Sequence, residues 1–325
     1  MYKASAANIH GITVNVPATT ANLGPGFDCL GLALELRNEI RFLRSGADLP
    51  YKDSETLYSI EAHGIDVDKI PRDNSNLAIE AIEKLFCLIE RRPETLNLQL
   101  KNCIPVGSGL GSSSSAIIAG LIGGNALFNN LVPQEVLLKL AVEMEGHSDN
   151  VAPALLGGLV LGVLPDAEMG PSELLIQRWD PPELTAVVVL PDFRLLTSEA
   201  RAVLPTVVSR SDAIFNISRL GYLIHALTTG NFNALRVAMG DKLHQPHRLK
   251  LIPGASEAYR AAMAQGALGV ALSGAGPSLI ALTIQNQESI AQAMIAAFND
   301  ADLDCRMWLL NPSNKGATVT YPSDL

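Results

Sequence analysis

The sequence predicts a protein of mixed α and β structure that divides into two domains. Segments with the two-residue period of strands alternate along the chain with segments that have the helical period. The chain of 325 residues is also longer than a single hydrophobic core usually serves. Residues 166–182 are mostly polar and end in two prolines, which is typical of a domain junction. We therefore predict one domain over residues 1–165 and a second over residues 166–325.

Strands dominate the first part of the chain. Residues 12–16 and 32–42 alternate between apolar and polar side chains, and residues 57–62 do so more weakly. A helix is expected over residues 74–91, where apolar residues recur at helical spacing. Residues 96–100 alternate again as a strand, and this strand leads directly into a segment rich in glycine.

Helices become more frequent after that segment. The apolar run at residues 116–122 predicts a helix, and residues 133–145 predict another with Pro133 in its first turn. Residues 186–190 form a continuous apolar run, which is typical of a strand buried on both faces. The remaining helices are expected near residues 198–203, 211–228 and 232–243. Residues 255–310 are then expected to run helix, strand, turn, strand, helix and strand.

The segment from Pro105 to Ser115 reads PVGSGLGSSSS and is the strongest functional signal in the chain. Glycine at every second position lets the backbone turn sharply and bring its N–H groups close to a ligand. The helix that follows adds unpaired N–H groups and the positive end of its dipole, which together favour a phosphate. The loop lacks the Gly-Lys-Ser/Thr of a P-loop, and Ser112 stands where the dinucleotide-binding pattern requires glycine. A flexible surface linker is the alternative, which the flanking apolar segments disfavour.

Three further clusters of polar residues interrupt apolar segments. The first, residues 17–28, carries Asn22 and Asp28 on a glycine-containing loop between two strands. The second, residues 143–150, gathers acidic, histidine and asparagine side chains at the end of a helix. The third, residues 273–278, reads SGAGPS between two short strands. Taken one at a time, these clusters also have purely structural explanations, as turn caps, a solvated helix end and a hairpin loop.

The composition argues against several classes of protein. A net charge of −9 without a cluster of Lys and Arg argues against nucleic-acid binding. The longest apolar run, residues 151–164, is shorter than the roughly 20 residues of a membrane span and is interrupted by proline and glycine. Residues 1–8 lack the apolar core of a signal peptide. The cysteines show no Cys-x-x-Cys pair, which favours reduced thiols in a cytoplasmic protein; they are Cys29, Cys87, Cys103 and Cys305.

Taken together, the three glycine-containing motifs resemble those of the GHMP small-molecule kinases. They read PATTANLGPGFD at residues 17–28, PVGSGLGSSS at residues 105–114 and SGAGPS at residues 273–278. The resemblance extends from Val14 to Leu310, and the first motif is most similar to that of the homoserine kinase branch. It implies a two-domain α+β fold. The N-terminal domain would resemble domain 2 of ribosomal protein S5, the C-terminal domain would be ferredoxin-like, and the active site would lie between them.

The resemblance also implies an activity and its cofactors. Phosphate would pass from ATP to the hydroxyl of L-homoserine, which yields O-phospho-L-homoserine for threonine biosynthesis. A Mg²⁺ ion would be held by Ser113 and Glu145, with Glu143 as the alternative carboxylate. ATP would contact Asn74 and the glycine-rich loop, whose members are Pro105, Val106, Gly107, Ser108, Gly109, Leu110, Gly111, Ser112, Ser113, Ser114 and Ser115. We expect Gly109→Val to weaken ATP binding in a protein that still folds.

The same resemblance assigns side chains to the substrate. Arg201 and Arg248 suit the carboxylate of homoserine, because guanidinium groups bind carboxylates bidentately, and Asp28 suits the ammonium. The substrate pocket would also include Asn22, His147, Asn150, Thr197 and Gly274. Catalytic roles at the reacting groups fall to Asn22, Asn150 and Arg201. No general base is implied, because positioning and charge stabilisation carry most of phosphoryl transfer, and the role of Asp149 stays open.

Two alternatives remain open at the level of the sequence. The chain could be a GHMP kinase for another amino acid or a polyol, or a sensor that binds ATP or a metabolite without transferring phosphate. Apart from the resemblance, Arg201 and Arg248 could equally form surface ion pairs. The resemblance to the superfamily makes a homodimer plausible, and the composition predicts neither a nucleic acid nor a membrane as a partner.

Overall fold

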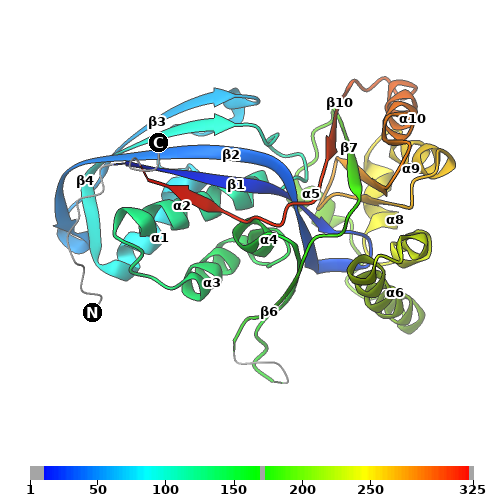
Figure 1. Ribbon diagram of the computed structural model, residues 1–325, viewed down its shortest axis with the longest axis horizontal. Coiled ribbons are helices and arrows are strands. Elements are labelled where there is room, and N and C mark those ends of the chain that lie inside the picture. Colours follow the sequence, from blue (N-terminus) through cyan, green and yellow to red (C-terminus); the bar gives the residue numbers. More distant parts are fainter. Residues whose placement is uncertain (1–10, 169–172, 322–325) are drawn as a thin grey trace.

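The computed structural model describes residues 11–168 and 173–321. Residues 1–8, considered above for a signal peptide, lie outside this range, as do residues 169–172 of the expected junction. The chain forms two sheets, each packed against helices, and these make up the left and right parts of Figure 1. The long strands β1 (Gly11–Asn22) and β2 (Gly26–Pro50) run from the first part into the second.

The first sheet has seven strands in the order β11-β1-β2-β4-β3, with β5 paired to β2 and β6 to β5. The strands besides β1 and β2 are β3 (Leu57–Gly64), β4 (Arg91–Asn102), β5 (Leu159–Val163), β6 (Leu175–Trp179) and β11 (Thr318–Thr320). Among the strands in the described part of the chain, β3 and β4 pair in parallel, and the other neighbours in this sheet pair antiparallel. Because β6 and β11 lie beyond residue 165, this sheet extends past the expected first domain.

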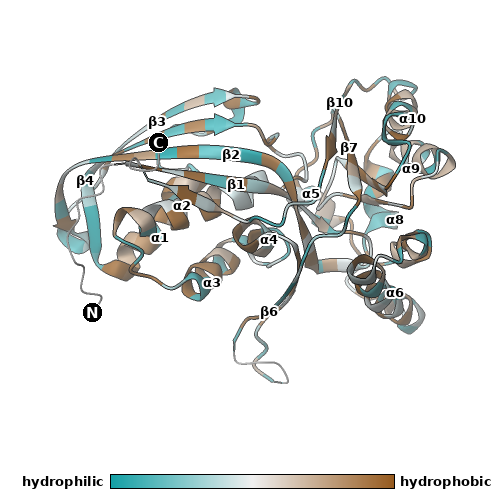
Figure 2. Cartoon of the chain, viewed as in Figure 1, coloured by the Kyte–Doolittle hydropathy of each residue, from teal (hydrophilic) through white to brown (hydrophobic). Residues whose placement is uncertain are grey.

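Four helices cover one face of the first sheet (Figure 1). They are α1 (Leu77–Ile89), α2 (Ser112–Leu127), α3 (Gln134–Glu145) and α4 (Val151–Leu156), and short 3₁₀ turns η1 (Tyr51–Asp53) and η2 (Val67–Lys69) flank β3. Helix α2 lies at the centre of this part and is buried along most of its length. A helix that is buried on most sides has apolar residues all round it, and the buried residues of α2 include Ile117, Ile118, Leu121 and Leu127; Figure 2 shows brown segments along the visible part of α2.

The second sheet has four antiparallel strands in the order β10-β7-β9-β8. They are β7 (Thr185–Pro191), β8 (Gly269–Leu272), β9 (Leu279–Thr283) and β10 (Cys305–Leu310). The accompanying helices are α5 (Thr197–Ala202), α6 (Arg210–Thr229), α7 (Leu235–Ala238), α8 (Gln245–Arg248), α9 (Ala255–Ala264) and α10 (Gln287–Asn299), with turns η3 (Phe232–Ala234) and η4 (Leu249–Leu251).

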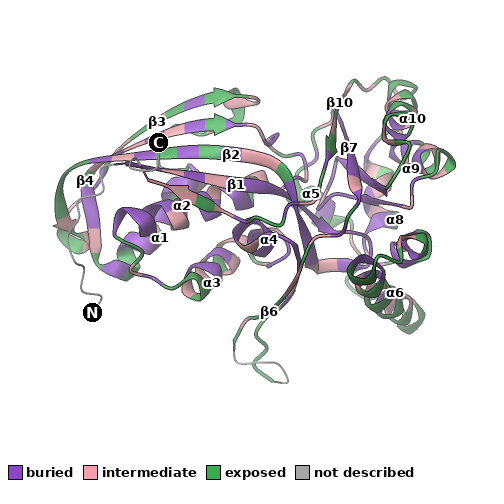
Figure 3. Ribbon diagram, viewed as in Figure 1, coloured by how far each residue is buried: buried purple, intermediate pink, exposed green. Residues whose placement is uncertain are grey.

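Strand β7 is buried on both faces, as its continuous apolar run predicts. Val187 and Val189 pack in one core with α9 and α10, and Val188 packs in the other with α6 and α7. The second of these cores also contains Leu23 and Leu30 from the β1–β2 hairpin. Figure 3 shows the hairpin as buried where it enters the second part. The hairpin thus belongs to both halves of the molecule.

The expected strands at residues 12–16, 32–42, 57–62 and 96–100 lie within β1, β2, β3 and β4. The first expected helix is shorter than residues 74–91. Asn76 caps it at the N-terminus by accepting a hydrogen bond from the Ala78 N–H at 3.0 Å, and β4 begins at Arg91. These two features limit α1 to Leu77–Ile89.

The helix expected over residues 232–243 is interrupted. Only Leu235–Ala238 is α-helical, and the chain turns at Asp241. The Asp241 carboxylate accepts hydrogen bonds from the N–H groups of Leu243, His244 and Gln245, which starts α8. This local capping outweighs the apolar periodicity on which the expectation rested. Across residues 11–168 and 173–321, no helix combines the length and apolar character required to cross a bilayer.

Candidate active site

A pocket of about 130 Å³ lies between the two parts of the molecule and receives side chains from both. The first part supplies the glycine-rich loop and the residues that follow α3. The second supplies α5, α8 and the loop between β8 and β9. The lining residues that the sequence predicts are Asn22, Asp28, Gly107, Ser108, Gly109, Gly111, Ser112, Ser113, Ser114, Glu145, His147, Asn150, Thr197, Arg201, Arg248 and Gly274. The structure therefore brings together motifs that lie more than 200 residues apart in the chain.

The glycine-rich loop ends in the N-terminus of α2, where Gly111 is the N-cap with a φ of 72°. The Ser114 side chain is buried at the pocket, and its Oγ has no hydrogen-bond partner among the described residues. A buried hydroxyl without a partner is costly, so a ligand oxygen would stabilise it. The loop thus offers helix N–H groups and a free hydroxyl to an anion.

Two neighbouring segments hold this loop in place. The Thr19 N–H of β1 donates to the Leu110 carbonyl at 3.1 Å. The Ser273 hydroxyl donates to the Gly109 carbonyl at 2.7 Å and contacts the Thr20 hydroxyl at 2.9 Å. The three glycine-containing motifs therefore form one hydrogen-bonded unit around the pocket.

The expected metal ligands lie side by side. The Ser113 hydroxyl donates to Glu145 Oε2 at 3.2 Å, at the start of α2 and the end of α3. Glu143 is exposed and does not line the pocket that contains the glycine-rich loop. A hydroxyl and a carboxylate beside a phosphate site are oxygen ligands of the kind that Mg²⁺ takes. The geometry favours Glu145 over Glu143.

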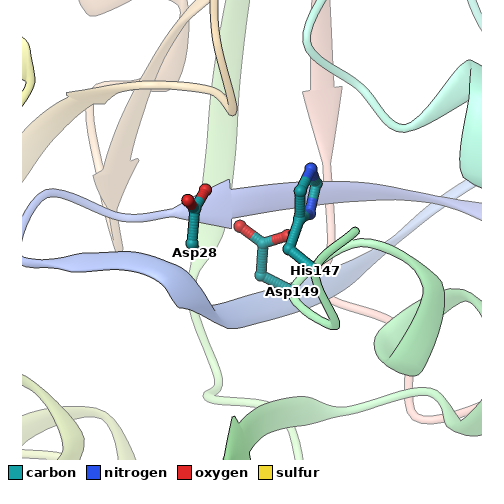
Figure 4. A group of neighbouring side chains, drawn as sticks. All are labelled: Asp28, His147 and Asp149. Atoms are coloured by element: carbon teal, nitrogen blue, oxygen red, sulfur yellow. The ribbon is translucent and has the colours of Figure 1, made fainter. Parts of the chain in front are cut away.

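An acidic cluster borders the same pocket (Figure 4). Asp28 comes from β2, and His147 and Asp149 come from the segment between α3 and α4, with one ligand atom from each within 4.8 Å of the others. The His147 Nδ1 is hydrogen-bonded to the buried carboxylate of Asp149. Burial alone would lower the pKa of His147, but the hydrogen bond and the charge of Asp149 outweigh it and raise that pKa above its ordinary value.

Arg201 and Asp28 face each other across the pocket and form a bidentate ion pair. Nη1 and Nη2 of Arg201 lie 2.9 and 2.8 Å from the two carboxylate oxygens of Asp28. This hydrogen bonding raises the pKa of Arg201 above its ordinary value. The residues expected to bind the carboxylate and the ammonium of the substrate are therefore bonded to each other in this structure.

Arg248 is almost completely buried behind this pair. Its Nε donates to the Ala200 carbonyl at 3.0 Å, and its Nη1 lies 3.4 Å from both the Gly274 carbonyl and His244 Nδ1. Burial, with the nearby positive charge of Arg201, lowers the pKa of Arg248 to about 10. Arg248 is thus held in a fixed position at the floor of the pocket.

The two expected asparagines differ in how their side chains are used. Asn22 has a φ of 72°, accepts from the Asp28 N–H at 2.9 Å and donates to the Gly274 carbonyl at 2.8 Å. It therefore joins the first and third motifs. Asn150 accepts from the Thr19 hydroxyl at 2.8 Å, which directs its amide nitrogen away from Thr19.

A second, more apolar pocket of about 280 Å³ adjoins the first and shares Gly107, Ser112 and Ser113 with it. Apolar side chains of β2, β4 and α2 line it, which suits the base of a nucleotide. Asn74 is exposed and does not line this pocket, whereas its neighbours Ser75 and Asn76 do.

Three residues of the glycine-rich loop point away from both pockets. Pro105 provides a carbonyl that accepts from the Ser108 hydroxyl, and Leu110 is buried in the core beneath the loop. Ser115 is turned by the helix toward β2, where its Oγ accepts from Asn38 at 3.0 Å. The side chains of these three residues therefore line neither pocket, and contact between this part of the segment and the ligand stays a prediction.

Several residues at the site had no role assigned from the sequence. Thr19 and Ser273 hold the glycine-rich loop through hydrogen bonds to its carbonyl groups. Phe27 lies beneath both guanidinium groups, with its ring centroid 5.7 Å from Arg201 Cζ and 5.0 Å from Arg248 Cζ. His244 lies behind Arg248 and donates toward the Gly24 carbonyl. Thr19 and Phe27 belong to the first motif, so the sequence placed them near the site. It did not give their roles, because the residues that they contact come from distant segments.

Both parts of the chain match profiles of one family. Residues 76–158 match the family described as GHMP kinases N terminal domain, and residues 223–301 match GHMP kinases C terminal. The crystal structure of L. major mevalonate kinase in complex with R-mevalonate shares the fold, with a TM-score of 0.68 at 16% identity and 100% coverage of both chains. The sequence prediction of a two-domain GHMP kinase fold is confirmed.

More similar proteins narrow the family further. The homoserine kinase of Nostoc punctiforme is 43% identical over 310 residues, which cover 95% of this chain and 98% of that relative. The homoserine kinase of Moorella thermoacetica is 43% identical over 307 residues, with 94% and 99% coverage. The crystal structure of homoserine kinase from Cytophaga hutchinsonii has a TM-score of 0.83 at 29% identity, with 98% and 100% coverage. The chain therefore belongs to the GHMP kinase family and, within it, to the homoserine kinases.

Proposed function

We propose that this protein transfers the γ-phosphoryl group of ATP to the hydroxyl of L-homoserine. The products are O-phospho-L-homoserine and ADP, as a step of threonine biosynthesis. The observation that carries the proposal is that one pocket combines the glycine-rich loop with Arg201, Arg248 and Asp28. An amino acid with a terminal hydroxyl has a carboxylate and an ammonium for these side chains and a hydroxyl for the phosphate.

The roles of the side chains follow from where they lie. The N–H groups of the loop and the Ser114 hydroxyl would bind the phosphates. Arg248 would bind the substrate carboxylate from the floor of the pocket, together with Arg201. Asp28 would bind the ammonium. Asn150, oriented by Thr19, would contact the reacting groups, and the fixed positions of these residues would hold the hydroxyl in line with the γ-phosphate.

The proposal includes Mg²⁺, for which Ser113 and Glu145 supply oxygen ligands. The ion would neutralise charge on the phosphate oxygens during transfer. Asn22 would act mainly by holding Asp28 and Gly274 in place, since its amide oxygen and nitrogen are both engaged with them. His147 and Thr197 complete the wall of the substrate pocket.

An ADP-release assay with homoserine, mevalonate, galactose and shikimate tests the proposal. We expect turnover with homoserine to exceed turnover with each of the other three. Faster turnover of another of these alcohols would show that this alcohol, and not homoserine, is the substrate. ATP binding without any turnover would indicate a sensor instead of an enzyme.

We also propose that the protein is a homodimer and that it is located in the cytoplasm. Sedimentation velocity tests the homodimer. The proposal of a cytoplasmic enzyme is supported by four cysteines that form no disulfide, as expected for a reducing compartment. Fractionation of cells tests it.

A further inference from the structure

The ion pair between Asp28 and Arg201 occupies the position that the proposed substrate would take. The two residues are 173 positions apart in the chain, and their side chains are 34% and 40% exposed to solvent. Both side chains line the pocket that contains the glycine-rich loop. A ligand that used either charge would have to break or share this pair.

The surroundings of the pair are charged with opposite signs on its two sides. Arg248 lies beside Arg201 over the same Phe27 ring, so two guanidinium groups need an anion there. On the other side, the carboxylate of Asp149 lies near that of Asp28 and is hydrogen-bonded to His147, so Arg201 is the cation that pairs with Asp28 (Figure 4). The ion pair thus neutralises charge on both sides as long as no ligand is bound.

We propose that the Asp28–Arg201 ion pair makes the pocket selective for zwitterionic amino acids, and we call this pair the selectivity latch. Only a ligand with both an ammonium and a carboxylate can separate the two side chains without leaving one of them unpaired. The inference rests on the proposed function. The ammonium of the ligand replaces Arg201 at Asp28, and its carboxylate replaces Asp28 at Arg201. Each protein group exchanges one partner for another, so the number of ion pairs does not fall.

A ligand with a single charge meets a different situation. A carboxylate alone would take Arg201 and leave Asp28 without a cation beside Asp149. An ammonium alone would take Asp28 and leave Arg201 without an anion beside Arg248. Leaving a partly buried charge unpaired is unfavourable, so the pair selects against such ligands in addition to binding the correct one.

The selectivity latch predicts a gain of affinity that would not occur if Asp28 and Arg201 were two independent contacts to the ligand. Removing one member of the pair frees the other, so a ligand with the matching single charge should bind the variant more tightly than it binds the wild type. If Asp28 and Arg201 acted only as independent contacts, removing one would leave the affinity for that ligand unchanged.

The test measures dissociation constants by calorimetry in the presence of ADP. The probes are L-homoserine, 4-hydroxybutyrate, which lacks the ammonium, and 3-aminopropanol, which lacks the carboxylate. We expect Asp28→Asn to bind 4-hydroxybutyrate roughly tenfold more tightly than the wild type, and Arg201→Gln to bind 3-aminopropanol more tightly by a similar factor. Both variants should bind homoserine more weakly.

Two controls make the result specific. The double variant Asp28→Asn/Arg201→Gln should lose both gains, because neither charge remains to be freed. Asp180→Asn removes the partner of Arg178 in an exposed ion pair outside the pocket and should leave all three affinities unchanged. Circular dichroism checks that each variant folds.

The outcomes separate the latch from the proposed function. If neither single variant binds its singly charged ligand more tightly, the latch is wrong, even when the wild type phosphorylates homoserine. If the gains appear but the wild type does not phosphorylate homoserine, the latch stands and the proposed substrate is wrong.

Discussion

Glu145 and Glu143 stand at the end of the same helix, but of the two only Glu145 lines the pocket between the two parts of the molecule and accepts a hydrogen bond from Ser113. Glu145→Gln keeps the shape of the side chain and removes the charge proposed to hold Mg²⁺. We expect kcat to fall roughly 10²-fold or more in the ADP-release assay. Glu143→Gln is the matched control and should leave kcat unchanged. A large loss in Glu143→Gln alone would transfer the metal role to that residue.

His244 is completely buried, and burial lowers the pKa of its imidazole below the ordinary value of about 6.5. The neutral ring fits its contacts, with Nε2 toward the Gly24 carbonyl at 2.8 Å and Nδ1 toward Arg248. The unfolded chain binds this proton more readily, so stability falls as the pH drops below about 6.5. We expect His244→Gln to reduce this fall, measured by urea denaturation between about pH 7 and pH 5. Parallel pH profiles for the two proteins would contradict the prediction.

At the scale of elements, the contact between the glycine-rich loop and the loop after β8 depends on Gly109. A Cβ built at Gly109, where φ is +81°, would lie 2.1 Å from the Ser273 carbonyl oxygen. The structure thus corrects the expectation for Gly109→Val, because the side chain would collide with the second part of the molecule before it reached a phosphate. We expect even Gly109→Ala to lower the unfolding free energy by more than the roughly 1–2 kcal/mol of a left-handed alanine.

Gly107 provides the comparison within the same loop. Its φ is +69°, but a Cβ there would have nothing within 4 Å. Gly107→Ala should therefore lower the unfolding free energy only by the cost of placing alanine in a left-handed conformation, about 1–2 kcal/mol, in the same denaturation experiment. Equal destabilisation of the two variants would show that the contact with Ser273 contributes nothing.

At the scale of the whole molecule, Asp66 ties the two parts together beside the glycine-rich loop. Its Oδ2 accepts from the Val106 N–H at 3.1 Å and lies 3.2 Å from Nη2 of Arg306 on β10. We expect Arg306→Gln to raise KM for ATP several-fold, because Asp66 then loses its anchor on the second sheet, and to leave KM for homoserine nearly unchanged. Steady-state kinetics measure both.

The stability of the same variant distinguishes positioning from a general loss of structure. The side chain of Arg306 is 44% exposed, and exposed ion pairs contribute about 0–1 kcal/mol, so Tm should change little. Arg260→Gln breaks an exposed pair with Glu257 within α9 and should change neither KM nor Tm appreciably. A rise in KM for ATP that appears only together with a large fall in Tm would argue against a positioning role.

Much of the fold could be read from local patterns. The strand period of residues 32–42, the apolar run of residues 186–190 and the glycine-rich loop before α2 each depend on neighbouring residues, and each occurs in the structure. Where a side chain caps or turns the chain, as Asn76 and Asp241 do, the periodicity overestimates the helix. Such capping competes with helical hydrogen bonds over a few residues, which a hydrophobic pattern does not report.

The sequence by itself determined the local elements, the glycine-rich loop before α2 and the set of charged residues proposed to bind a substrate. Only the tertiary structure decided which of these meet. It paired Asp28 with Arg201 across 173 positions, brought β6 and β11 into the first sheet and placed Ser273 against Gly109. The physical reason is that periodicity and turn chemistry act between near neighbours, whereas these contacts form only when two hydrophobic cores pack around the shared β1–β2 hairpin and bring distant segments together.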